Sequence, residues 1–113
     1  MSINKHQIFA SNDLKEKFVD MPEWGGQIKI RALSVKEQLA YDDYLSTEPK
    51  EVEMALHLIV SACVDDNNQK LFDISDMDLL KEKSSKNLFF LVNEILALNK
   101  QQPADSDELA KNL

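Results

Sequence analysis

The two glycines of this chain are adjacent and close the segment 22–26 (PEWGG). We expect a short strand on each side of the turn, over residues 17–22 and 27–32. Apolar and charged side chains alternate along the second of these segments. Adjacent glycines supply the positive φ angles that a tight hairpin turn requires. We therefore expect a β-hairpin near the N-terminus.

Two Gly and three Pro in 113 residues are too few for an all-β fold, since a sandwich or barrel needs a turn about every 8–12 residues. The remainder of the chain favours helices over residues 35–46, 50–64, 75–82 and 85–99. Ser34 and Glu37 form a capping-box pattern for the first helix. Pro49 opens the second, Asp73 or Ser75 caps the third, and Ser84 or Ser85 caps the fourth. The predicted fold class is α+β, an N-terminal β-hairpin followed by a small bundle of about four helices.

The helix over residues 50–64 has the clearest apolar face. That face carries Val52, Ala55, Leu56, Ile59, Val60, Ala62 and Cys63. Met54, Leu58 and Val64 fall off it, so the helix should be central and contacted from two directions. The last helix has a stripe of Leu88, Leu91, Val92, Ile95 and Leu98, flanked by Phe89 and Leu96.

The domain organisation follows from length and composition. A chain of 113 residues is long enough for one domain with its own core. We expect a loosely ordered lead-in over residues 1–13, a single α+β domain over residues 14–100, and a flexible acidic tail over residues 101–113.

The net charge of −7 argues against a nucleic-acid partner, because such binding depends on Lys and Arg neutralising phosphates. The acidic middle of the chain is either a solvated helix surface or a docking face for a basic partner. Apolar runs of four or five residues are far shorter than the ~20 of a membrane helix. With no secretory signal and one Cys, we expect a protein of the reducing cytoplasm, with no membrane partner.

Catalytic and cofactor-binding motifs are not apparent in the sequence. His57 falls on the polar side of its helix, where a solvated or core-edge histidine is favoured over a catalytic one. Cys63 falls on the apolar face, where a small buried side chain is favoured over a nucleophile. We expect no catalytic residue, no metal and no cofactor.

The turn after the central helix weakly resembles a calcium loop, with Asp65, Asn67 and Gln69 at alternate positions. Lys70 stands where the bend of such a loop requires Gly, and Asp76 stands where a longer Glu is preferred. A solvated turn between helices is therefore the favoured interpretation.

Four apolar residues are candidates for binding a protein partner, namely Trp24, Met54, Leu58 and Phe90. Met54, Leu58 and Phe90 fall off the core-facing stripes. Trp24 either packs on its own hairpin or helices, or anchors a partner. Phe90 either faces a partner or is covered by a further layer of the fold.

Several segments in order resemble one known family. They are FVDMPEWGG at residues 18–26, IKIRAL at residues 28–33, CVDDN at residues 63–67 and LAKN at residues 109–112. The chain resembles the tail assembly chaperones of long-tailed bacteriophages and prophages over most of its length, and PEWGG is the most specific part. That family often carries Gly where Asn68 stands here.

The resemblance implies a non-enzymatic protein that binds and solubilises the tape measure protein during tail assembly, with the major tail protein as a further partner. It implies action in the cytoplasm of the bacterial host and absence from the mature virion. Met54, Leu58 or Phe90 would supply contacts, since an aggregation-prone apolar chain needs a soluble cover. Self-association stays open. The alternative is a structural minor tail or head–tail connector component, and an enzyme or a regulator of host enzymes is a weaker one.

Many members of that family are also made as a longer product by ribosomes that slip back one nucleotide near the end of the gene. Ala110, Lys111 and Asn112 can be encoded as GCA-AAA-AAC, which contains a slippery run of adenines, although Lys-Asn is also a common dipeptide. If these three residues mark a slip site, the gene sequence shows an unbroken A-AAA-AAC. An AAG codon for Lys111 would rule the site out.

Overall fold

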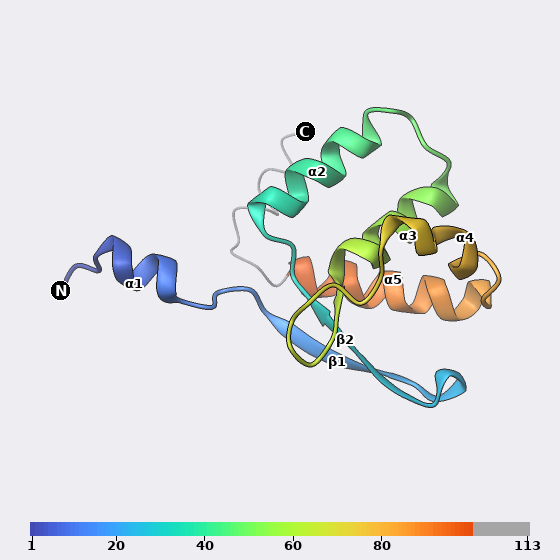
Figure 1. The fold of residues 1–113 in the computed structure, drawn as a ribbon, viewed down its shortest axis with the longest axis horizontal. Helices are drawn as coiled ribbons and strands as arrows, with labels where there is room; N and C mark the ends of the chain where they lie inside the picture. The colour runs from blue at the N-terminus through green and yellow to red at the C-terminus, as the bar shows by residue number, and fades with distance from the viewer. Residues whose placement is uncertain (101–113) are drawn as a thin grey trace.

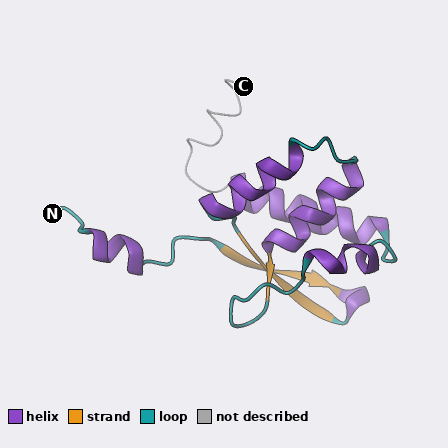
Figure 2. Ribbon diagram, turned by 45° about the horizontal axis from the view of Figure 1, so that its top comes forward, coloured by secondary structure: helices purple, strands orange, loops and turns teal. Residues whose placement is uncertain are grey.

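The computed structural model describes residues 1–100 and shows an α+β fold, as predicted (Figure 1). Three antiparallel strands, in the order β1-β2-β3, form a sheet with the helices packed on one of its faces (Figure 2). The elements in chain order are α1 (Lys5–Ala10), β1 (Glu16–Met21), the 3₁₀ turn η1 (Pro22–Trp24), β2 (Gly26–Arg31), α2 (Val35–Leu45), α3 (Glu51–Ala62), β3 (Cys63–Val64), the 3₁₀ turn η2 (Ile74–Asp76), α4 (Met77–Leu80) and α5 (Ser85–Lys100). The predicted acidic tail, residues 101–113, lies outside the described residues.

The predicted hairpin is confirmed, although its turn uses one glycine rather than two. β1 and β2 pair with Val19 opposite Ile28 and Met21 opposite Gly26. The turn is the 3₁₀ segment η1, and Gly25 follows it with φ of +87°, a left-handed conformation that favours glycine. Gly26 is the first residue of β2, and no positive φ is required there.

The prediction of a helix over residues 50–64 is wrong at its C-terminal end. α3 ends at Ala62, and Cys63 and Val64 form β3, which pairs with Ile30 and Lys29 of β2. Both side chains are buried. Pairing with this short strand covers an edge of β2 whose N–H and C=O groups would otherwise lack partners, and this tertiary gain outweighs two more residues of helix.

The core lies between the sheet, α3 and α5. Its fully buried large side chains are Ile30, Leu56, Ile59, Leu91 and Ile95, together with Val64 and Cys63 of β3. Two residues of α3 depart from the predicted facing. Val52, in the first turn, is 48% exposed, whereas Leu58 is only 4% exposed. α3 therefore turns Leu58 rather than Val52 toward the inside of the fold.

The segment over residues 1–13 contains a short helix that stands away from the body of the molecule (Figure 1). Asn4 and Gln7 cap α1 reciprocally, with hydrogen bonds of 2.8 and 2.9 Å. Every residue from 1 to 13 is exposed, including Ile8 and Phe9. α1 is thus built by local capping alone and adds nothing to the core.

The third predicted helix is divided into η2 and α4, which together span residues 74–80 instead of 75–82. The side chain of Asp73 accepts hydrogen bonds from Ser75, so Asp73 is the cap of this segment. Ser84 caps α5, because its Oγ accepts a bond of 3.3 Å from the N–H of Asn87. Two alternative caps were predicted for each of these helices. The structure shows Asp73 for the third helix and Ser84 for the fourth.

Asn68 adopts φ of +63° in the turn that follows β3. A side chain with a Cβ costs about 1–2 kcal/mol in this left-handed region, with Gly and Asn the tolerated residues. We expect Asn68→Ala to lower the free energy of unfolding by about 1 kcal/mol and Asn68→Gly to change it little. Urea denaturation measures both. Asn67→Ala is the matched control. An equal effect of N68A and N67A would show that the positive φ of Asn68 is not the cause of the lost stability.

Candidate protein-binding groove

An apolar groove follows the seam between α3 and α5. It consists of two hollows, of about 160 and 280 Å³, that share Ala55 and Phe89. The smaller hollow is also lined by Val52, Leu56, Lys81, Lys83, Ser85 and Leu88. The larger one is also lined by Tyr41, Glu51, Met54, Leu58, Val92, Asn93 and Leu96. The groove therefore has contributions from three helices and from the turn between α4 and α5.

The floor of the groove is buried and its rim is exposed and apolar. Leu56, Leu88 and Val92 are at most 7% exposed, whereas Phe89 is 37% and Leu96 46% exposed. A rim of this kind presents apolar surface that association with another polypeptide would remove from water. The two hollows differ in charge, with Lys81 and Lys83 at the smaller one and Glu51 at the larger one.

Two of the predicted partner-binding residues, Met54 and Leu58, come together in the larger hollow. Met54 is partly exposed. Leu58 is buried and forms part of the floor. Its burial agrees with the expectation that this helix is contacted from two directions, and it leaves Leu58 only the floor of the hollow for contact with a partner.

Trp24 lies at the hairpin, where its indole is partly buried against the hydrophobic core. Its remaining surface borders a hollow of about 370 Å³ that is also lined by Glu23, Phe72, Leu80 and Lys83. The indole thus packs on its own fold and still offers one edge to the surface.

Phe90 is 47% exposed on α5 and borders neither hollow of the groove. It lies beside Phe89 in the sequence but belongs to a different part of the surface. The remaining predicted residues, Ala110, Lys111 and Asn112, lie outside the described residues.

Sequence reasoning missed Phe89, Leu96 and Tyr41 as groove residues. Phe89 and Leu96 stood out only as flanks of the core stripe of the last helix. Flanking positions of a broad apolar stripe lie at the border between core and solvent, which is where the rim of a groove forms. Tyr41 gave no such signal, because its helix has no pronounced apolar face.

α2 provides one wall of the groove, and none of its residues is fully buried. The hydroxyl of Tyr41 donates a hydrogen bond of 3.3 Å to the carbonyl oxygen of Met54. The ring of Tyr44 stacks on His57 of α3 with centroids 4.0 Å apart. Burial lowers the pKa of His57, which favours a neutral imidazole in this stack. α2 is therefore attached to α3 through tyrosines rather than through a packed apolar face.

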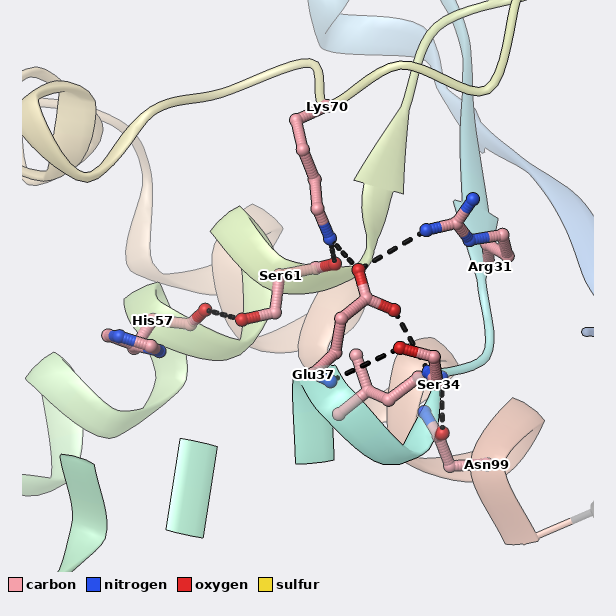
Figure 3. A network of polar contacts seen from close by, with 8 residues as sticks. Arg31, Ser34, Glu37, His57, Ser61, Lys70 and Asn99 are labelled. Carbon is pink, nitrogen blue, oxygen red and sulfur yellow. Dashed lines mark hydrogen bonds and ion pairs between the residues drawn. The ribbon is translucent and has the colours of Figure 1, made fainter. Parts of the chain in front are cut away.

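The start of α2 is fixed by a polar network centred on Glu37 (Figure 3). As predicted, Glu37 and Ser34 form a capping box, with hydrogen bonds of 2.9 and 3.1 Å. The other Glu37 oxygen accepts from Arg31 of β2 at 3.2 Å and from Lys70. Lys70 also donates to the carbonyl oxygen of Ser61 in α3. One carboxylate thus joins the sheet, α2 and the loop after β3.

A second polar contact holds the segment before α2. The side-chain oxygen of Asn99 in α5 accepts a hydrogen bond of 3.0 Å from the N–H of Leu33. Its amide nitrogen donates at 2.9 Å to the carbonyl oxygen of Ile95. The position of α2, and with it the Tyr41 wall, therefore depends on contacts near the C-terminal ends of α3 and α5.

Cys63 is buried, and the calcium-like turn is held by its own hydrogen bonds. Burial raises the pKa of the Cys63 thiol to about 12, so this sulfur is protonated at neutral pH and a poor nucleophile. Within residues 1–100, no three His, Cys, Asp or Glu side chains are grouped to hold a metal ion. Asp65, the first residue of the calcium-like turn, accepts hydrogen bonds from the N–H groups of Asn67 and Gln69.

No helix in residues 1–100 combines the length and the apolar character that a membrane crossing requires. No protein-family model matches the chain, and no curated protein matches it significantly.

The arrangement of a β-hairpin, a short third strand and a helical layer is similar to the fold of a solved phage tail assembly chaperone. The solved structure in question is the tail assembly chaperone of bacteriophage HK97, which superposes with a TM-score of 0.61. The match covers 83% of this chain and 91% of that chain, with 18% sequence identity. The resemblance seen in the sequence is therefore confirmed at the level of the fold.

The Glu37 network makes stability depend on pH. Burial acts to raise the pKa of Glu37, but the hydrogen bond from Lys70, the N–H of Ser34 and the charge of Arg31 outweigh it, so the pKa lies below its ordinary value of 4.5. A carboxyl with a lowered folded-state pKa stabilises the fold above about pH 4.5, and this contribution is lost as pH falls through the folded value.

We expect Glu37→Gln to lower the free energy of unfolding by about 1 kcal/mol at pH 7, because the amide loses two charge-assisted hydrogen bonds. The difference from the unsubstituted protein should shrink below pH 4.5. Urea denaturation at pH 7 and pH 3.5 measures both values. Glu82→Gln, at an exposed position, is the control, and a difference that persists at pH 3.5 would contradict the ionic origin.

Proposed function

We propose that this protein is a tail assembly chaperone that binds the tape measure protein of its phage or prophage and keeps it soluble during tail assembly. The observation that carries the proposal is the likeness of the fold to the HK97 chaperone over 83% of the chain. The protein acts in the cytoplasm of the bacterial host, breaks and forms no covalent bond, and is absent from the mature virion. The major tail protein is a further proposed partner.

The groove supports this proposal because it joins apolar contact surface to a strongly charged molecule. Phe89 and Leu96 expose apolar surface at the rim, while the chain as a whole carries a charge of −7. A long helical partner with uncovered apolar stripes aggregates unless a soluble protein covers them. The groove would cover such a stripe, and the net charge would keep the complex in solution.

The proposed contact residues are those of the groove. Phe89 and Leu96 supply the rim, and Met54 supplies an adaptable side chain, because methionine fits partners of different shape. Leu58 contributes through the floor. Trp24 and Phe90, which lie outside the groove, are proposed as secondary contacts.

Co-expression with the tape measure protein from the same gene cluster tests the proposal. We expect the soluble fraction of the tape measure protein to fall severalfold when this chain is omitted. Equal solubility with and without the chain would overturn the proposal. Mass spectrometry of purified virions tests the other part, since a structural tail or connector component would be present in stoichiometric amounts.

A matched pair of variants tests the groove itself. Phe89→Asp places a carboxylate at the junction of the two hollows, where contact with an apolar partner would bury an unpaired charge. We expect this variant to lose at least tenfold in affinity for the tape measure protein, and the neighbouring Phe90→Asp to lose much less. Leu96→Asp serves as a second groove variant, and circular dichroism confirms that each variant is folded. Equal loss in F89D and F90D would place the contact outside the groove.

A further inference from the structure

The end of the groove at the α4–α5 turn is positively charged, in contrast to the rest of the chain. Residues 81–86 carry Lys81, Lys83 and Lys86 with one acidic residue, Glu82, a sum of +2 in a protein of net charge −7. Lys81 and Lys83 line the smaller hollow next to Val52 and Leu88. Ammonium groups and apolar surface are therefore combined in one place.

These ammonium groups are available to a partner. No carboxylate of residues 1–100 lies within ion-pair distance of Lys83. Lys81 pairs with Asp78 at 3.5 Å, but the side chain of Asp78 is 92% exposed. Exposed pairs of this kind are weak and are readily exchanged for another carboxylate.

The size and the floor of the hollows favour side chains of a polypeptide over a small molecule. At about 160 and 280 Å³, each is smaller than the ~300–1,000 Å³ of typical small-molecule pockets. Two adjacent apolar hollows on a helix–helix seam suit an amphipathic helix, whose anchor residues recur every three or four positions.

The larger hollow has an acidic residue in place of the lysines. Glu51 lines the larger hollow, and Glu53 lies in the same first turn of α3. A helix with carboxylates along its whole length would be repelled there. The charge difference between the two hollows thus favours a helix whose carboxylates are grouped beside the smaller hollow.

We propose that the groove binds an amphipathic helix of its partner whose apolar side chains enter both hollows and whose acidic residues lie against Lys81 and Lys83. The inference rests on the proposed function, because it specifies which segments of the tape measure protein the chaperone recognises. These segments are apolar helices with Asp or Glu grouped beside the anchor that enters the smaller hollow.

Overlapping peptides of about 25 residues that cover the tape measure protein provide the probe. Fluorescence anisotropy measures the binding of each peptide to the full chain, to K81E/K83E and to K15E/K36E. The two double variants change the net charge equally, but Lys15 and Lys36 are exposed and lie outside the groove. The comparison therefore separates a local charge effect from the effect of total charge.

We expect the bound peptides to carry grouped acidic residues beside apolar ones, and K81E/K83E to bind them about tenfold more weakly in 50 mM salt than K15E/K36E does. The difference should narrow in 0.5 M salt, where exposed charges are screened. F89D should abolish binding in both salts. Bound peptides without acidic residues, or equal affinities of the two double variants, would overturn the inference.

Failure of the inference and failure of the proposed function give different results. If peptides bind the groove without dependence on Lys81 and Lys83, the chaperone function stands and the charge selection fails. If neither the peptides nor the full tape measure protein bind, the proposed function fails. If no peptide binds and F89D changes the mass measured by light scattering, a second copy of this chain occupies the groove, and the inference is wrong.

Discussion

The direct continuation of α3 into β3 is the constraint on which the rest of the structure depends. No loop separates Ala62 from Cys63, so the helix cannot tilt or slide without breaking the pairing of Cys63 with Ile30. α3 is thereby fixed to the sheet, and α5 packs against α3. The groove lies on the seam between these two helices, so its shape follows from this covalent junction. Substantial movement of the floor would require loss of part of the sheet.

α2 is attached to the rest of the fold mainly by polar contacts. It buries no residue fully and is positioned by the Glu37 network, the contact with Asn99 and two tyrosines. Directional contacts of this kind fix orientation while adding little apolar stabilisation. One wall of the groove is therefore held less strongly than the floor. Under the proposed function, a firm floor and an adaptable wall would let the groove accept different segments of its partner.

The sequence predicted those features that have a local cause. Alternation in β2 and the adjacent glycines indicated the hairpin, and the Ser34–Glu37 pattern located the start of α2, because both signals depend on neighbouring residues. It missed β3, since two residues are too few to show a period and Cys63 continued the helical face of α3. It placed the exposed Val52 on the buried face, and it did not identify Phe89 as a rim residue, because exposure at the edge of a stripe depends on where neighbouring elements lie. The position of α2 depends on Lys70 and Asn99, which are distant in sequence.

The projecting α1 has a practical consequence. Because residues 1–13 are exposed throughout, the core places no steric demand on what precedes β1. A fluorescent protein or an affinity tag joined at Met1 would leave the groove uncovered in this conformation. The N-terminus is therefore a suitable point of attachment for following the protein in cells.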